Sequence, residues 1–326
     1  MRDNLDMASG SVAIVGAGII GGSIAWRLAQ AGVPATLFDA GVAGGETSSA
    51  GAGILSPGGE FERPSHWFDL GLESIGMYPA FVEELRAESD VAIDFQISGG
   101  KHFVDADHAR KRAEFQSRAG VHVELTPYGL FYPSDAFVDP TDILRALRRA
   151  CEARRVEIIE KHPIAEIESS DYRAVVIAAG AWSNQIRVLH HGKSVTLPMV
   201  KPIKGHLIGF QLPPGALGPM LRRGHSYVLQ RSNGFTIAGS NEQDVGFNRE
   251  VDPGICEEIH RHGAELFPPL ANLKPSARWI GLRPYSPDGP HIGRVENTNV
   301  WLAYGHFRNG ILLTPLTSKR ISEGII

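Results

Sequence analysis

SVAIVGAGIIG, residues 11–21, joins a short apolar run to a glycine-rich turn. The β-branched residues of 11–15 are typical of a buried parallel strand. Apolar residues at helical spacing then continue to Gly32, and the pattern predicts a helix that ends there. Residues 35–38 (ATLF) predict a second strand, which closes on Asp39. The segment is therefore expected to form a β-α-β unit with G-x-G-x-x-G at its first turn.

Each glycine of this turn has a physical role in binding a dinucleotide. Gly16 permits the tight turn, Gly18 lets a pyrophosphate approach the backbone, and Gly21 lets helix and strand pack closely. The start of the helix offers free N–H groups and the positive end of a dipole to the phosphates. Asp39 can accept hydrogen bonds from the ribose of an adenosine. Strand, turn, helix and acid together favour a dinucleotide site over a glycine-rich turn without a cofactor.

The segment that follows Asp39 bears on the choice between FAD and NAD. Residues 44–53 (GGETSSAGAG) are too rich in glycine and serine for an ordinary crossover. Small residues beside a pyrophosphate allow backbone N–H groups and hydroxyls to contact it. FAD lies extended and needs such a second contact segment, so the pattern favours FAD. A flexible surface loop, and an NAD-dependent dehydrogenase that would be colourless, are the alternatives.

Two kinds of sheet are predicted in the rest of the chain. Apolar runs at 156–159, 174–179 and 300–304, with helices over 66–90, from 139 and from 311, continue the parallel α/β pattern. Short β-rich runs at 203–210, 226–230 and 235–238, separated by turn residues, are typical of antiparallel sheet. A helix over 254–267 and strand-like runs over 93–104 and 278–284 complete the pattern.

We therefore expect an α/β fold in which a Rossmann-like, parallel-sheet FAD domain carries an inserted, mostly antiparallel β substrate domain. The FAD-binding domain is assigned to residues 11–90, 139–196 and 285–326. The substrate-binding domain is assigned to residues 91–138 and 197–284. The arginines that follow Asp139 (Arg145, Arg148 and Arg149) are interpreted as a solvated helix face.

Composition narrows the function classes. Of 326 residues, 43% are hydrophobic and 21% charged, as in a globular protein, and the net charge of −4 disfavours nucleic acid or an anionic membrane as a partner. Cys151 and Cys256 are isolated, so neither a disulfide framework nor a metal site is expected. No apolar run is long enough for a transmembrane helix. Residues 1–10 lack the apolar middle of a signal peptide and are interpreted as a short tail, which favours a cytoplasmic location.

The most specific motif is GHFRNGILLTP at residues 305–315. It resembles the signature of the ThiO-type glycine oxidases, which belong to the D-amino acid oxidase family of flavoproteins. The G-x-G-x-x-G unit, the 44–53 segment and WIGLRPYSPDGPHIG (279–293) agree with that family in order and spacing. Residues 105–133 and 166–173 are shorter than the family pattern. The first difference concerns the rim of the active site, and the second resembles a trimmed surface hairpin.

The resemblance implies non-covalent FAD and a set of contact residues. Residues 308–310 are expected to open a helix whose dipole stabilises the reduced flavin. The expected cofactor contacts, including the glycines of the two loops, are Gly16, Gly18, Ile19, Ile20, Gly21, Asp39, Ala40, Gly45, Thr47, Ser48, Ala52, Gly53, Ile54, Ile164, Gly180, His306, Phe307, Arg308, Asn309, Gly310, Ile311 and Leu312.

The resemblance also implies the substrate residues. Arg283 and Tyr227 match the family's carboxylate binders, Arg308 matches a second arginine near the substrate, and His225 matches a position at the site entrance. A guanidinium binds a carboxylate in a bidentate way and a phenol adds a donor, which agrees with these roles. A structural ion pair for Arg283, a structure-only role for Arg308, a packed aromatic for Tyr227 and a structural histidine at 225 are the alternatives.

The implied reaction is oxidation of glycine, sarcosine or a small D-amino acid by hydride transfer to the flavin. Oxygen reoxidises the flavin to give hydrogen peroxide, and the imino acid hydrolyses to glyoxylate and ammonia. No residue is assigned as a catalytic acid or base. Glu242 is interpreted as a surface acid, and Glu60, Asp94 and Asp288 receive no role.

Several alternatives stay open. The first is an oxidase or dehydrogenase of D-amino or N-methyl amino acids, and the second is a flavin-binding protein without turnover. The family also suggests a role in thiamine biosynthesis and a homo-oligomer.

Overall fold

The first layer of the fold is a six-stranded sheet. A computed structural model describes residues 10–326, and the strand order in this sheet is β19-β20-β11-β1-β2-β9. Five strands are parallel: β1 (Val12–Val15), β2 (Ala35–Phe38), β9 (Glu157–Ile159), β11 (Ala174–Ile177) and β20 (Val300–Tyr304). Only β19 (His291–Arg294) runs antiparallel to its neighbour. The predicted α/β fold class is confirmed.

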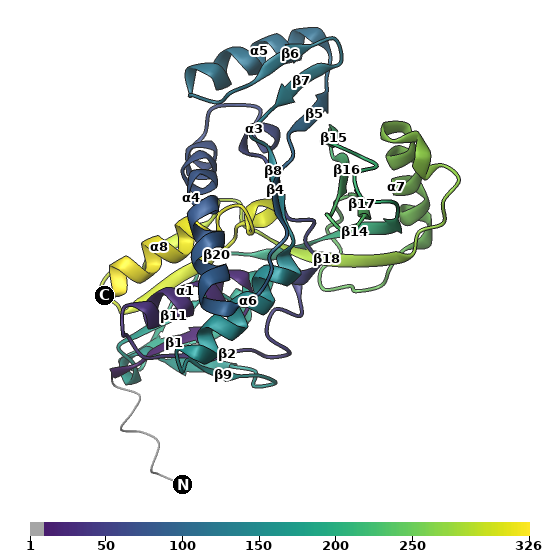
Figure 1. Cartoon of the computed structure of the whole chain (residues 1–326). Coiled ribbons are helices and arrows are strands. Elements are labelled where there is room, and N and C mark those ends of the chain that lie inside the picture. The colour runs from purple at the N-terminus through teal and green to yellow at the C-terminus, as the bar shows by residue number, and fades with distance from the viewer. Residues whose placement is uncertain (1–9) are drawn as a thin grey trace.

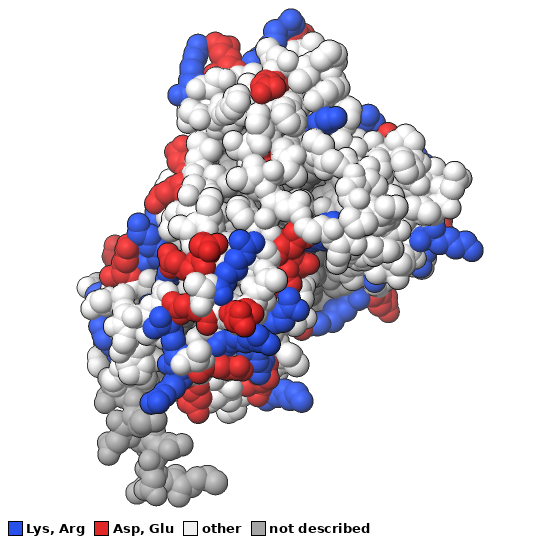
Figure 2. All heavy atoms as spheres, viewed as in Figure 1, with Lys and Arg blue, Asp and Glu red and all other residues white. Residues whose placement is uncertain are grey.

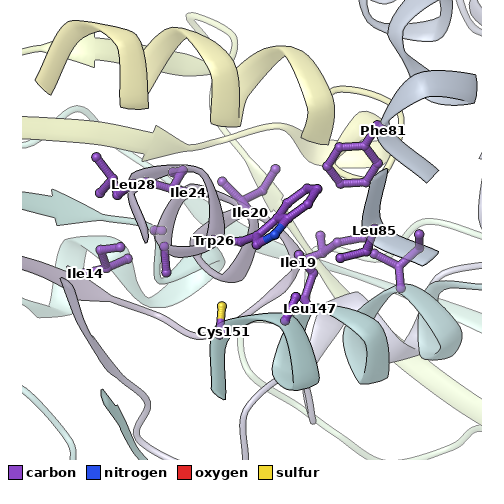
Figure 3. Packing of buried hydrophobic residues seen from close by; sticks show 14 of the residues in the cluster. Ile14, Ile19, Ile20, Ile24, Trp26, Leu28, Phe81, Leu85, Leu147 and Cys151 are labelled. Carbon is purple, nitrogen blue, oxygen red and sulfur yellow. The ribbon is translucent and has the colours of Figure 1, made fainter. Parts of the chain in front are cut away.

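Helices pack on this sheet through a shared apolar core (Figure 1). They are α1 (Ile19–Gln30), α4 (His66–Ser89), α6 (Pro140–Ala153) and α8 (Thr314–Ile325). Figure 3 shows Trp26 and Phe81 converging with Leu147 and Cys151 between α1, α4 and α6. The Trp26 and Phe81 rings meet edge-on, with centroids 5.6 Å apart. This core, together with the Trp26 Nε1 hydrogen bond to Glu88 at 2.9 Å, fixes the direction in which α1 points.

The second layer is an eight-stranded sheet that is antiparallel except where β15 meets β5. Helix α7 (Pro253–Leu266) packs at one end and α5 (Ala106–Arg118) at the other, as the green and blue-teal parts of Figure 1 show. The strands, in sheet order, are β18 (Ala277–Tyr285), β14 (Lys201–Gln211), β17 (Phe235–Gly239), β16 (Ser226–Gln230), β15 (Met220–Arg223), β5 (Gly100–Phe103), β7 (Gly129–Tyr132) and β6 (Glu124–Thr126).

Smaller elements connect the two layers. One three-stranded sheet contains β3 (Ile54–Leu55), β8 (Ala136–Val138) and β4 (Phe95–Ile97), and another contains β10 (Glu166–Glu168), β12 (Arg187–His190) and β13 (Lys193–Val195). The short helices are α2 (Thr47–Ala50), α3 (Pro57–Glu60), η2 (Ser169–Asp171), η3 (Gly180–Gln185), η4 (Pro268–Leu270) and η5 (Phe307–Asn309). The strands of the two large sheets come from the segments predicted for the two domains. The exact domain boundaries stay a prediction.

The structure corrects two local predictions. The last helix begins at Thr314 and not at Ile311, and Pro315 occupies its first turn, where a missing N–H is harmless. Arg308 and Asn309 lie instead in the 3₁₀-helix η5, which follows left-handed Gly305 (φ +82°) and begins at left-handed Phe307 (φ +50°). Helix α5 was not predicted, although its N-cap, Asp105, accepts from the backbone of residues 107 and 108.

Charged side chains of both signs are interspersed on the face of the molecule that carries α6 (Figure 2). Arg145 and Arg148 are exposed and pair with Asp142 and Glu160, which confirms the predicted solvated helix face. No helix within residues 10–326 combines the length and the apolar character needed to cross a membrane. The predicted N-terminal tail lies outside the described residues except for Gly10.

Candidate functional site

The first turn of the β-α-β unit has no room for larger residues. A Cβ atom on Gly16, whose φ is +108°, would lie 2.4 Å from the carbonyl oxygen of Ala178. A Cβ on Gly21 would lie 1.9 Å from the carbonyl oxygen of Gly16. Ser48 Oγ accepts a hydrogen bond from the backbone N–H of Ile19 at 3.0 Å, so the 44–53 segment meets the start of α1. This is the close approach of loop, strand and helix end that a pyrophosphate site requires.

A groove runs from this turn past the end of β2. Asp39 closes β2 and accepts from the backbone N–H groups of Ala17 (2.9 Å) and Gly41 (2.8 Å), which holds its carboxylate at the groove wall. We call this part the outer-sheet section. Its walls include Gly16, Gly18, Asp39, Ala40, Gly45, Thr47, Ser48, Ile164 and Gly180 among the predicted cofactor residues.

The groove continues into an inner section between the two large sheets. Gly18, Thr47, Ser48 and Gly180 line both sections, so the two form one elongated groove. The predicted residues that line the inner section are Ile19, Ile20, Ala52, Gly53, Ile54, His306, Phe307, Arg308, Asn309, Gly310 and Ile311, together with Tyr227 and Arg283. Gly21 and Leu312 lie behind the walls, Gly21 in the turn and Leu312 in the apolar core.

Arg283 on β18 lies flat over a glycine of the next strand. A Cβ on Gly205 would meet its Nη1 at 2.1 Å, so only glycine leaves space for the guanidinium. Nη1 donates to the carbonyl oxygen of Asn241 and Nη2 to Ser240 Oγ, both at 3.0 Å. Burial lowers the pKa of Arg283. Within residues 10–326 the hydrogen-bond partners of the guanidinium are these two groups and no carboxylate, so the structural ion pair considered above is not present there.

Tyr227 on β16 occupies the neighbouring position in the same wall. Its hydroxyl lies over Gly239, where an added Cβ would be 2.6 Å away. The ring packs with Leu207 and Leu229, so it is a packed aromatic as well as a wall residue. Burial raises the pKa of Tyr227, so the phenol stays protonated and can donate a hydrogen bond.

Arg308 is held by acids on two sides. Its Nε contacts Glu60 at 3.1 Å, and its Nη1 contacts Glu242 at 3.1 Å and His225 Nδ1 at 2.9 Å. Burial by itself would raise the pKa of Glu60, but Arg222 and Arg308 lower it to about 2. Glu242 is exposed, as predicted, and His225 lies at the exposed end of this network.

Sequence reasoning left Glu60 and Arg222 without a role. Glu60 is the last residue of α3 and is largely buried, with 12% of its side chain exposed. It lines the inner section together with Arg308. The run Pro-Gly-Gly-Glu at 57–60 indicates a turn, but no local signal pairs an acid at 60 with arginines at 222 and 308.

The remaining candidates for proton transfer are structural. His306 is buried, its Nε2 lies 3.0 Å from Thr317 Oγ1, and burial lowers its pKa to about 3. His291 pairs with Ser286 at 2.8 Å. Cys151 and Cys256 are buried free thiols, and neither lines the groove.

A glycine-rich turn that leads into an elongated groove fits an FAD-dependent oxidoreductase. Residues 11–323 match the DAO family model, described as FAD dependent oxidoreductase, and the chain belongs to that family. FAD is therefore its cofactor.

Relatives that match almost the whole of this chain agree with this membership. The chain is 31% identical to glycine oxidase from Bacillus subtilis (strain 168), with 96% of this chain and 92% of the relative covered. It is 29% identical to the bifunctional protein ThiO/ThiG from Synechocystis sp., with 97% of this chain and 51% of the relative covered. The crystal structure of glycine oxidase from Geobacillus kaustophilus superposes with a TM-score of 0.90 at 27% identity, covering 98% of this chain and 95% of that one.

Proposed function

We propose that this enzyme oxidises the CH–NH₂ group of a small amino acid, with glycine as the main substrate and glyoxylate, ammonia and hydrogen peroxide as products. One observation carries the proposal. Arg283 and Tyr227 line the same inner section as the predicted FAD contacts of α1 and of residues 306–311. The relatives named glycine oxidase support the choice of glycine.

The residues of the chain would act mainly by positioning. The guanidinium of Arg283 can bind the substrate carboxylate as a fork, and the protonated phenol of Tyr227 can donate a further hydrogen bond. Ser240 and the carbonyl of Asn241 hold the guanidinium in place. FAD, when bound, supplies the redox chemistry by accepting a hydride from the substrate carbon and passing the electrons to oxygen.

Among the described residues that line the inner section, neither the one carboxylate nor the one histidine is an effective base. The pKa of Glu60 is about 2 and that of His306 about 3, so both are very weak bases near neutral pH. Since hydride leaves a carbon that bears a neutral amine, the substrate itself must lose its ammonium proton to water. The proposal therefore ties the rise of kcat/KM with pH to the substrate amine.

FAD is proposed to be bound without a covalent link. Both cysteines are buried away from the groove, and burial raises the pKa of Cys151 to about 12, which leaves almost no thiolate. Acid precipitation of the protein should release all of the FAD into the supernatant. Yellow colour that stays with the pellet would contradict this.

The substrate is tested by mixing the FAD-loaded protein anaerobically with glycine, sarcosine, D-alanine and D-proline and following the visible flavin band. Fast bleaching by glycine or sarcosine, with peroxide after air is readmitted, is the expected result. Bleaching only by the larger D-amino acids would move the substrate assignment. Bleaching without peroxide would indicate a dehydrogenase, and no bleaching by any of them would contradict amino-acid oxidation.

A further inference from the structure

A second cavity, here called the outer pocket, lies beside the inner section. The two share Glu60 and Arg308 in their walls. The outer pocket is lined by four arginines, Arg63, Arg112, Arg222 and Arg308, against two glutamates, Glu60 and Glu62. This local excess of positive charge contrasts with the net charge of −4 of the chain. Positive charge in a partly enclosed cavity favours an anionic ligand.

Two of these arginines are buried and incompletely paired. The side chain of Arg222 is 6% exposed and its Nη2 contacts Glu60 at 2.5 Å, while its Nη1 has no hydrogen-bond partner within residues 10–326. The side chain of Arg112 is 9% exposed, and its Nε also lacks a partner there. A buried N–H of a charged group that lacks an acceptor is costly, so an acceptor in this pocket would be favourable.

Arg112 is held rigidly, which makes the pocket a built site. Its Nη2 donates to the carbonyl oxygens of Gly58 (2.7 Å) and Gly59 (2.8 Å), the two residues before Glu60. Gln116 also donates to Gly58 at 2.8 Å and accepts from Tyr132 at 2.8 Å. The unpredicted helix α5 therefore fixes the turn that carries Glu60.

The register of the eight-stranded sheet places the outer pocket close to the proposed substrate anchor. His102, Arg222 and Tyr227 are direct cross-strand partners on β5, β15 and β16, which are neighbours in Figure 1. Direct partners point to the same face of a sheet, and strands lie ~4.8 Å apart. Arg222 thus lies about one strand spacing, ~5 Å, beyond Tyr227. A ligand held at Tyr227 by one carboxylate could reach Arg222 with a second acidic group a few bonds away.

We propose that the outer pocket binds a second acidic group on ligands whose first carboxylate is held at Arg283 and Tyr227, with Arg222 as its principal donor, so that dicarboxylates bind more tightly than matched monocarboxylates. The inference rests on the proposed function because Arg283 and Tyr227 anchor the first carboxylate. Glu60 forms ion pairs with both Arg222 and Arg308, and Glu242 forms an ion pair with Arg308. Arg222 lies in the outer pocket beside the shared wall, and its Nη1 is left without an acceptor within residues 10–326.

The test uses two probes that carry no amine and cannot be oxidised in this way. Oxydiacetate has a carboxylate at each end of an ether, and ethoxyacetate replaces one of them by a methyl group. Calorimetric titration of the FAD-loaded protein should show oxydiacetate binding at least ~10-fold more tightly, as expected for an added charge-assisted hydrogen bond of ~1.5–3 kcal/mol. Arg222→Met should abolish the difference.

Arg223→Met is the matched control. Arg223 is the next residue on β15, points to the opposite face and has 53% of its side chain exposed, so the preference for oxydiacetate should persist. Arg222→Lys keeps the charge without the fork and should retain part of the preference, which covers the case that Arg222→Met does not fold. The comparison of the two probes on the unmodified protein requires no variant at all.

Equal affinity of the two probes for the unmodified protein would overturn the proposal. Inorganic phosphate distinguishes a substrate-borne group from a separate anion. Phosphate binding that needs Arg222 and leaves oxydiacetate no tighter than ethoxyacetate would also overturn it. Arg283→Met should lower the affinity for both probes by the same factor. If it weakens neither while the Arg222-dependent preference persists, the proposed carboxylate anchor fails and the outer pocket stands.

Discussion

The two ends of the groove are built by different means. The outer-sheet section begins at the tight turn of Gly16 and Gly21, where an added Cβ would meet backbone, and much of its lining comes from residues 15–48. The inner section adds polar side chains that are far apart in the chain, those of Glu60, Tyr227, Arg283 and Arg308. The first end should therefore be intolerant of added volume, and the second of lost charge or hydrogen bonds.

Substitution of Gly21 tests the first half of this comparison and should have the largest effect. In Gly21→Ala the new Cβ would lie 1.9 Å from the Gly16 carbonyl oxygen, and no flexible side chain can yield. We expect protein that is purified without FAD or fails to fold, measured by the visible absorbance and by thermal unfolding.

Gly22→Ala is the control for this prediction. A Cβ at Gly22 would meet only Leu147 at 3.6 Å, an ordinary contact, and alanine is favoured over glycine in a helix by ~1 kcal/mol. FAD content should be unchanged. If Gly21→Ala also retained full FAD and stability, the tight-turn interpretation would be wrong.

Substitution of Arg283 tests the second half. Removal of a buried, hydrogen-bonded charge partner costs ~2–5 kcal/mol, so Arg283→Met should lower kcat/KM for glycine by ~30-fold to several thousand-fold while FAD content is unchanged. Arg278→Met, an exposed arginine on the same strand, is the control and should have little effect. If Arg283→Met lost FAD together with activity, Arg283 would be needed for binding the cofactor, which would contradict the separate roles of the two ends.

Glu60 links the site to stability. Its carboxylate compensates Arg222 and Arg308, and breaking a buried pair costs about 3 kcal/mol or more, so Glu60→Gln should lower the free energy of unfolding by about this amount near neutral pH. Because the folded-state pKa is lowered from 4.5 to about 2, this contribution is present above pH 4.5 and is lost as the pH falls through about 2.

Urea unfolding at neutral and acidic pH measures this linkage. The difference in the free energy of unfolding between unmodified protein and Glu60→Gln should become smaller as the pH falls below 4.5. Glu62→Gln, at an acid with 79% of its side chain exposed, should show no comparable difference. If the Glu60→Gln difference in the free energy of unfolding stayed constant over the whole pH range, it could not come from the ionised carboxylate of Glu60.

Tyr227→Phe should give the smallest effect. It removes one hydroxyl and keeps the packed ring, and a hydrogen bond of ~1–1.5 kcal/mol predicts a loss of about 5- to 13-fold in kcat/KM for glycine. Steady-state kinetics with peroxide detection provide the measurement. Unchanged kinetics would favour the alternative that Tyr227 is only a packed aromatic.

The strand, turn and helix of the dinucleotide end could be predicted from the sequence because their determinants are local. The strand, the glycines and Asp39 lie within 28 residues of one another, and periodicity and turn chemistry describe them. The α/β class and the antiparallel second sheet followed from the same local patterns. The last helix was placed three residues early, because Ile311 and Leu312 continue an apolar run that in fact packs as a turn before Pro315.

The substrate end could be predicted only in part. Arg283, Tyr227 and Arg308 were named from family resemblance, and the structure places all three in one wall. The Glu60–Arg222–Arg308 network was missed because it depends on the parallel pairing of β5 with β15 and on α5, whose charged sequence gives a weak apolar pattern. Such long-range pairing has no local signature in a single sequence.

Arg283 and Tyr227 are proposed to anchor a substrate carboxylate at the inner end of the FAD groove. The most direct test compares anaerobic flavin reduction by glycine and by ethanolamine, in which a hydroxymethyl group replaces the carboxylate. Glycine should bleach the flavin, and ethanolamine at the same concentration should not. Equal bleaching by both would show that the carboxylate is not recognised and would contradict its proposed binding by Arg283 and Tyr227.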